Sequence, residues 1–268
     1  MGRKGARLGQ HFLTGAWAAR ALARAAEISE NDTVLEIGPG KGALTRELLA
    51  LGARVIAIEK DEALAEKLRR AFAQEISNER LQLIEKDIRD FDPRILKLEA
   101  RSYCLAANIP YYITGEIIRI FLTAEAQPRT IAFLVQKEVA ERIVARDGKE
   151  SILSISVKAY GKPRIVAKVT RGNFSPPPSV DSAILIISGI SREFFAGIKE
   201  EKFFQLVRAG FASKRKLLAG NLSGKFGFTK PEILKVFGGC GVPEYARAED
   251  VPLPKWKCLA RRLSDNSV

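Results

Sequence analysis

The chain is short of the residues that many hydrolases and metal sites need: its 268 residues include one histidine and three cysteines. A single histidine, His11, makes a Ser-His-Asp triad or a multi-histidine metal site hard to build. The cysteines, Cys104, Cys240 and Cys258, are odd in number and lack CxxC spacing. We therefore expect neither a disulfide framework nor a zinc site, and we interpret the cysteines as small apolar side chains.

The sequence also has no run of about 18 uncharged apolar residues, which a membrane-spanning helix would need. The basic residues 1–7 are not followed by an apolar core of the kind found in signal peptides. We therefore expect a cytoplasmic protein without a membrane partner.

Positive charge is in clear excess, with 44 Lys and Arg against 31 Asp and Glu, a net charge of +13. A solubilising surface would account for part of this excess. A polyanionic partner accounts for it better, because each phosphate that a cation neutralises releases a condensed counterion. The charge therefore favours a nucleic-acid partner.

From Asp32 onward, short apolar runs alternate with stretches of helical character, a pattern typical of a parallel α/β sheet. The runs that we interpret as parallel strands are 33–37, 54–58, 81–84, 103–107 and 130–135. Two more β-rich runs, 164–169 and 182–187, follow one another without a crossover helix, so we expect an antiparallel pair at one edge of the sheet. The pattern predicts a seven-stranded mixed sheet whose last strand is reversed.

Strand signals disappear after about residue 188. The remaining sequence contains three segments that read as short helices, 201–209, 231–237 and 255–263. We therefore expect a second, small, all-helical domain at the C-terminal end.

Polar groups and glycines follow the first three predicted strands. The loop Gly38-Pro39-Gly40-Lys41-Gly42 would let the backbone approach a ligand closely, although glycines here also suit a plain tight turn. Glu59 ends the second strand, where a carboxylate can accept hydrogen bonds from both ribose hydroxyls, unless it is an ordinary solvated side chain. Asp87 ends the third strand and would suit either an adenine amino group or an N-cap. Together they indicate a nucleoside-like ligand.

The fourth strand leads into Asn108-Ile109-Pro110-Tyr111. The exocyclic amine of a purine is a poor nucleophile because its lone pair is delocalised into the ring. Acceptors on the Asn108 side chain and the Ile109 backbone would hold its two N–H groups and turn the lone pair toward a methyl donor. Pro110 would keep this geometry stiff, and Tyr111 offers a ring on which an unstacked base can stack. The segment indicates methylation of an amine on a base.

These four residues resemble the signature of adenine-N6 methyltransferases that act on nucleic acid. Further segments resemble the ribosomal RNA adenine dimethyltransferase family, in the same order along the chain: 9–13, 36–42, 174–182, 211–216 and 247–249. The resemblance covers Gly9 to about Leu263, nearly the whole chain. Two positions depart from the family pattern: His11 stands where members usually carry Asn, and Tyr112-Ile113-Thr114 stands where many carry Asn-Ile-Ser.

The resemblance implies a Rossmann-like class I methyltransferase fold. Residues 1–187 would form the domain that binds S-adenosylmethionine, and residues 188–268 a helical RNA-binding domain. The implied cofactor-binding residues are His11 and Leu13 in a lid, Gly38 at the methionine part, Glu59 at the ribose, Asp87 at the adenine, and Asn108 beside the methyl group.

The resemblance also implies how the target base is held. Asn108 and Tyr111 would be the catalytic residues, and Tyr111 and Phe174 would stack on the two faces of a flipped adenine. Lys214, Arg215 and Lys216 would contact RNA phosphates, although a solubilising charge run explains them as well.

The implied reaction is N6,N6-dimethylation of two adjacent adenosines in the 3′-terminal hairpin of small-subunit (16S) rRNA, late in ribosome biogenesis. S-adenosylhomocysteine would be the product, no metal would be needed, and the enzyme would act as a monomer on the small-subunit precursor. Two alternatives remain: a large-subunit (23S) rRNA adenine methyltransferase of the macrolide-resistance type, and a non-catalytic RNA-binding assembly factor. The triple-proline loop and the helical tail favour the small-subunit enzyme.

Overall fold

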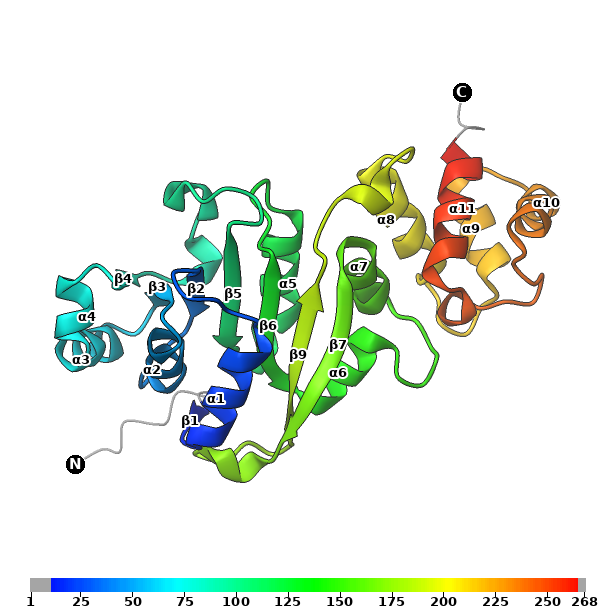
Figure 1. Ribbon diagram of the computed structural model, residues 1–268. Coiled ribbons are helices and arrows are strands. Elements are labelled where there is room, and N and C mark those ends of the chain that lie inside the picture. The colour runs from blue at the N-terminus through cyan, green and yellow to red at the C-terminus, as the bar shows by residue number, and fades with distance from the viewer. Residues whose placement is uncertain (1–10, 265–268) are drawn as a thin grey trace. The chain divides into compact units, whose positions relative to one another are not determined.

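The computed structural model describes residues 11–264, and they belong to two compact units (Figure 1). The first unit contains the chain up to Ala140 together with Lys162–Ile190, and the second contains Glu141–Gly161 and the chain from Ser191 onward. Residues 141–161 belong to the second unit because their side chains bond within it: Lys149 pairs with Asp250, and Tyr160 donates a hydrogen bond to Glu200. The predicted domain division after residue 187 would instead place residues 141–161 with the first unit. In the described part of the chain, no helix is long and apolar enough to cross a membrane.

A seven-stranded sheet forms the centre of the first unit, in the order β4-β3-β2-β5-β6-β9-β7. Its strands are β2 (Thr33–Ile37), β3 (Arg54–Glu59), β4 (Leu81–Glu85), β5 (Tyr103–Asn108), β6 (Thr130–Gln136), β7 (Lys162–Val169) and β9 (Ser182–Ser188). Strands β2 to β6 pair in parallel, whereas β9 runs antiparallel to both β6 and β7. The predicted mixed sheet with its last strand reversed is confirmed.

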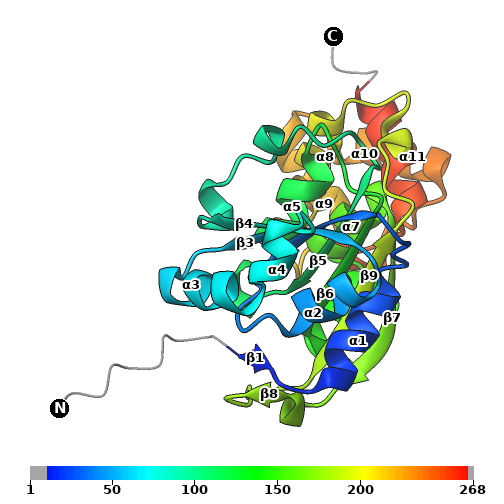
Figure 2. The ribbon, with the colours of Figure 1, turned by 60° about the vertical axis from the view of Figure 1, so that its left-hand side comes forward.

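The central strands are buried on both faces, as expected for parallel strands that read as continuous apolar runs. Val34, Val55 and Cys104 are register partners on three neighbouring strands, and they share one core cluster with apolar side chains of the helices on that face. Those helices include α1 (Ala16–Ala25), α2 (Ala43–Ala50) and α3 (Glu62–Ala71), which Figures 1 and 2 show along the sheet. The other helices of this part of the chain are α4 (Ala73–Ser77), α5 (Thr114–Thr123) and α6 (Lys137–Val144).

A separate two-stranded ribbon joins segments that are far apart in the sequence. Strand β1 (Phe12–Leu13) pairs antiparallel with β8 (Phe174–Ser175), side by side in Figure 2. The Thr14 amide also donates to the Asn173 carbonyl at 2.9 Å, which extends the contact beyond the ribbon. The ribbon brings His11 to the edge of the site described below.

The described residues of the second unit form helices and connecting turns, with no strand. Its helices are α7 (Ile152–Tyr160), α8 (Glu200–Gly210), α9 (Leu218–Phe226), α10 (Lys230–Cys240) and α11 (Leu253–Ser264). The core is rich in aromatic rings: Phe195 and Phe203 pack edge-on at 5.8 Å, and the fully buried Trp256 stacks on Phe211. The predicted all-helical C-terminal region is confirmed.

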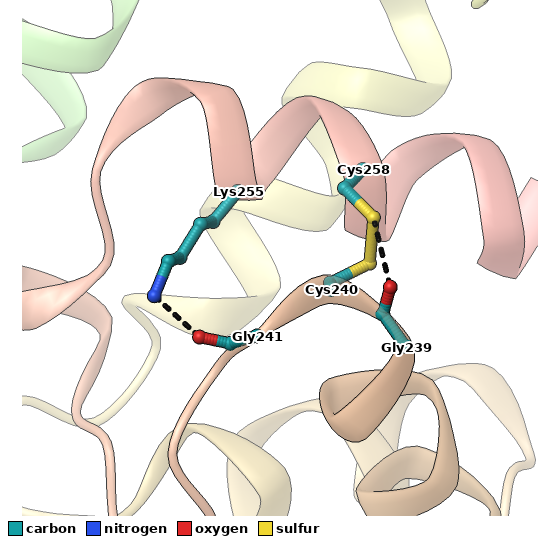
Figure 3. Close-up of a disulfide and its surroundings, with 5 residues drawn as sticks. All are labelled: Gly239, Cys240, Gly241, Lys255 and Cys258. Atoms are coloured by element: carbon teal, nitrogen blue, oxygen red, sulfur yellow. Dashed lines mark hydrogen bonds between the residues drawn. A yellow bond between two sulfur atoms is a disulfide. The ribbon is translucent and has the colours of Figure 1, made fainter.

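The interpretation of all three cysteines as free apolar side chains is wrong for two of them. Cys240, at the end of α10, forms a disulfide with Cys258 on α11 (Figure 3). The side chain of Lys255, also on α11, donates a hydrogen bond to the Gly241 carbonyl next to it. Spacing could not predict the pair because the contact arises from the packing of two helices. Cys104 is unpaired and buried, as expected.

Candidate functional site

A cavity opens at the carboxyl ends of β2, β3, β4 and β5, and β1 forms part of its wall. It is lined by His11, Phe12, Ile37, Gly38, Gly40, Ile58, Glu59, Lys60, Leu64, Lys86, Asp87, Ile88, Asn108, Ile109, Pro110, Tyr111 and Ile113. Most of the apolar members are isoleucines, while most of the polar members lie at the strand ends. This position is where open α/β sheets bind ligands. Six predicted residues, His11, Gly38, Glu59, Asp87, Asn108 and Tyr111, therefore meet in one cavity.

The glycine loop after β2 leaves space open along the cavity. Gly38 and Gly40 both have positive φ, +67° and +60°, which residues with a side chain adopt only with strain. A Cβ atom on Gly38 would meet no heavy atom within 4 Å, whereas one on Gly40 would lie 3.1 Å from the Phe12 ring. Gly38 thus faces open space that a ligand can fill, and Gly40 allows Phe12 to approach.

Glu59 is buried, with 4% of its surface exposed, and it holds the glycine loop as well as facing the cavity. Its Oε2 accepts a hydrogen bond from the Gly40 amide and its Oε1 from the Asp61 amide, each at 3.0 Å. A carboxylate has about four lone-pair sites, so capacity remains for two further donors. The side chain can therefore bind a diol while keeping the loop in place.

Glu36, one residue before Ile37 on β2, was not predicted as a functional residue. It is 1% exposed and accepts a hydrogen bond from the Thr45 hydroxyl at 2.7 Å. Burial, with a contribution from the nearby charge of Glu59, raises the pKa of Glu36 to about 8. The sequence does contain a signal for this residue, because Glu36 lies within an apolar strand. An acidic side chain buried in such a strand seldom remains unpaired.

Asp87 combines both of the roles that the sequence left open. Its Oδ1 accepts a hydrogen bond from the Arg89 amide as the N-cap of a short 3-10 helix, and the carboxylate also lines the cavity. The Arg89 guanidinium binds it through two nitrogens, Nε at 3.1 Å and Nη2 at 2.6 Å. This partner lowers the pKa of Asp87 to about 2, so the cavity carries a fixed carboxylate at this point.

Asn108 is the last residue of β5, and its amide group is held in one orientation. Nδ2 donates a hydrogen bond to the His11 carbonyl at 3.0 Å. The amide oxygen then remains as the acceptor, and it forms no hydrogen bond with any other described residue. The predicted geometry requires an acceptor at this position to hold an N–H group of the target amine, and the Asn108 oxygen can be that acceptor.

Tyr111 is half-buried, and its ring is fixed from two sides. The hydroxyl lies 2.9 Å from the Ser182 hydroxyl, and the ring stacks against His11 with centroids 5.9 Å apart. His11 in turn donates from Nδ1 to the Pro176 carbonyl at 2.9 Å, since a carbonyl oxygen only accepts. Sequence reasoning gave no role to Ser182, although the residue closes the 174–182 motif.

Two predicted site residues, Leu13 and Phe174, do not line the cavity. Leu13 is 7% exposed and Phe174 is 4% exposed, and both belong to the core cluster beneath the ribbon. They face each other across β1 and β8. Stacking of Phe174 on a target base therefore stays a prediction.

The predicted RNA contacts lie in the second unit, in the turn between α8 and α9. Lys214, Arg215 and Lys216 are all exposed, and none of them forms an ion pair with another described residue. The Asn221 side chain donates to the carbonyls of Gly210 and Ser213, which fixes the start of this turn. Three cations on a fixed turn are available to a polyanion. Within residues 11–264, no cluster of three or more His, Cys, Asp or Glu is placed to hold a metal ion.

Comparison with known proteins agrees with this geometry. Residues 1–254 match the family model described as ribosomal RNA adenine dimethylase. A protein from Dehalococcoides mccartyi strain CBDB1, named ribosomal RNA small subunit methyltransferase A, is 41% identical and covers 98% of this chain and 89% of its own. Its namesake from Moorella thermoacetica is 37% identical over 95% of this chain and 91% of its own.

Solved structures agree as well. A dimethyladenosine transferase from Plasmodium falciparum superposes with a TM-score of 0.83 at 26% identity, covering 96% of this chain and 99% of its own. The 23S rRNA methyltransferase ErmE gives a TM-score of 0.76 at 27% identity, covering 94% and 99%. The Rossmann-like class I methyltransferase fold is thus confirmed. The chain belongs to the ribosomal RNA adenine dimethylase family and is an rRNA adenine dimethyltransferase.

Proposed function

We propose that this enzyme uses S-adenosylmethionine to dimethylate N6 of two adjacent adenosines in the 3′-terminal hairpin of small-subunit rRNA during ribosome biogenesis. The observation that carries the proposal is one cavity that joins the carboxylates at the ends of β3 and β4 to Asn108 and Tyr111 at the end of β5. The carboxylates suit a nucleoside, and the amide and ring suit a second base beside it.

The residues present fit S-adenosylmethionine. The open space at Gly38 accommodates a ligand chain, Glu59 has two free acceptor sites for a ribose diol, and Asp87 is a permanent carboxylate for an adenine amino group. When bound, the cofactor supplies an electrophilic methyl group and leaves as S-adenosylhomocysteine. We assign to His11 the closure of the cavity, and to Leu13 the anchoring of the strand that carries it.

At the target, the enzyme acts by positioning. The Asn108 oxygen accepts an N–H of the adenine amine and thereby turns the nitrogen lone pair toward the methyl donor. Tyr111 stacks on the base after it has been swung out of the RNA. As the bond from N6 to the methyl carbon forms, the bond from that carbon to sulfur breaks, and the positively charged nitrogen then loses its proton to water. No strong general base is needed, because holding the two groups in line supplies most of the acceleration. Phe174 is assigned to the second face of the base, which requires its ring to move out of the core.

The preference for the small subunit rests on the names of the relatives. The two named for the small subunit and cited above are 41% and 37% identical over almost the whole chain, whereas the 23S enzyme ErmE is 27% identical. We assign cofactor binding to residues 1–187 and RNA binding to residues 188–268, with Lys214, Arg215 and Lys216 on RNA phosphates. We further propose that the enzyme is a cytoplasmic monomer that needs no metal and binds the small-subunit precursor.

The test is transfer of labelled methyl groups to small and large ribosomal subunits from a strain that lacks this methylation, followed by primer extension. We expect a block at two adjacent adenosines near the 3′ end of the small-subunit rRNA, and none on the large subunit. Labelling of the large subunit alone would replace this proposal with the 23S alternative. RNA binding without any methyl transfer would favour a non-catalytic assembly factor.

A further inference from the structure

Tyr112 is a largely exposed aromatic side chain directly beside the cavity. It lies in a short 3-10 helix, Tyr111–Ile113, between two residues that line the cavity, and it is 64% exposed. Successive side chains of a 3-10 helix point about 120° apart, so Tyr112 leaves the turn in a different direction from its neighbours. Single exposed apolar side chains are common, so exposure alone assigns no role.

The turn that carries Tyr112 is held on several sides. Ile113 is buried, and its amide donates to the Pro110 carbonyl at 3.2 Å. The Thr114 hydroxyl donates to the Tyr111 carbonyl, also at 3.2 Å, and the Tyr111 hydroxyl bonds Ser182. A ring on a fixed backbone loses little conformational freedom when it binds a partner. Tyr112 is therefore presented to solvent as a preorganised flat surface.

A cation lies close to the same surface. Arg89 is within electrostatic reach of Tyr112, and it is 46% exposed while it binds Asp87. Its contacts to Asp87 use Nε and Nη2, so Nη1 forms no hydrogen bond with another described residue. An exposed ring with a guanidinium within electrostatic reach suits a nucleotide, whose base stacks on the ring while its phosphate binds the cation.

We infer that Tyr112 is the platform on which the nucleotide next to the target adenosine stacks, with Arg89 beside its phosphate. The inference rests on the proposed function. Swinging the target out of the RNA removes the stacking partner of its neighbour and exposes one face of that base. A ring at the mouth of the cavity restores the lost stacking and fixes the register of the RNA. Tyr112 is thus a positioning residue for substrate, whereas Tyr111 contacts the reacting base.

The experiment compares Tyr112→Ala, Tyr112→Leu and Tyr112→Phe. Steady-state methyl transfer is measured with under-methylated small-subunit particles as the varied substrate, and cofactor binding is measured by calorimetry. For Ala and Leu we expect the KM for particles to rise about 5- to 150-fold, equivalent to about 1–3 kcal/mol for stacking one base. Phe keeps the ring and should stay within about 2-fold of wild type, and cofactor affinity should not change in any variant. Trp17→Ala, an exposed aromatic of the same unit away from the cavity lining, is the matched control and should behave as wild type.

Three results would overturn the inference: an unchanged KM in the Leu variant, a Phe variant as impaired as Leu, or a cofactor affinity that falls in parallel with KM. The last would mean that Tyr112 acts through the shape of the cavity. Failure of the wild type to transfer methyl groups would overturn the proposed function itself, so the two failures are distinguishable.

Discussion

The two units of the chain use their polar side chains in opposite ways. In the first unit, the strand-end groups Glu59, Asp87 and Asn108 are bonded to backbone or to a partner and face one cavity. In the second, the three cations of the 214–216 turn are exposed, and the interior contains apolar side chains, among them packed aromatic rings. Fixed groups can be assigned roles from geometry, whereas exposed cations can be assigned only a kind of partner.

The largest effect is expected at Asn108. Replacing it with Ala removes the acceptor at the cavity and the hydrogen bond to His11, so we expect kcat to fall roughly 100- to 1,000-fold, the usual loss for one positioned polar group. Asn108→Asp keeps an acceptor but loses the donor and should retain more activity. RNA affinity, measured separately by filter binding, should not change. Undiminished transfer by the Ala variant would remove Asn108 from the site.

Neutralising the basic turn should weaken RNA binding and leave the cofactor site unchanged. With Lys214, Arg215 and Lys216 all changed to Gln, we expect weaker RNA binding and a plot of log affinity against log salt that is shallower by about 2–3. Cofactor affinity should equal that of wild type. A triple change of exposed lysines outside the cavity lining, Lys67, Lys162 and Lys230, is the charge-matched control. Equal loss in both triples would mean that only net charge matters.

The disulfide should stabilise the second unit without affecting the chemistry of the first. Cys240 and Cys258 are 18 residues apart, and closing a loop of that length contributes about 3 kcal/mol to the free energy of unfolding. We expect reductant to lower the midpoint of urea unfolding of the wild type. The midpoint of the Cys258→Ser variant should not respond to reductant. A wild-type midpoint that does not respond to reductant would contradict the disulfide.

The stability of the first unit should depend on pH through Glu36. Its pKa is about 8 in the folded protein, against 4.5 for an ordinary glutamate, so the folded state holds more protons than the unfolded state between these values. Stability therefore falls as pH rises from about 4.5 to 8. The Glu36→Gln side chain cannot titrate. As pH rises over this range, the melting temperature of the variant should therefore increase relative to that of the wild type. A constant difference between the two would show that Glu36 is already ionised.

The sequence predicted most of the first unit because its signals are local. A strand followed by a polar residue identifies a strand end, and the parallel sheet brings strand ends together, which is why Gly38, Glu59, Asp87 and Asn108 were found. Contacts between distant segments left no such signal. The ribbon between β1 and β8, the bond from Tyr111 to Ser182 and the disulfide all depend on tertiary packing. Burial of Phe174 was missed for the same reason, since the motif gives its identity but not its neighbours.

The pairing of β1 with β8 sets an order for the assembly of the site during synthesis. His11 reaches its place only when Phe174 and Pro176 are available, 165 residues later in the chain for the His11–Pro176 bond. At about 5–20 residues per second, the ribosome takes on the order of ten seconds or more to supply them. Within that time the ribosome adds first the glycine loop and then, 97 residues after His11, Asn108, whereas the β1–β8 ribbon still lacks its second strand. The growing chain therefore acquires its binding surface before it acquires a closed site.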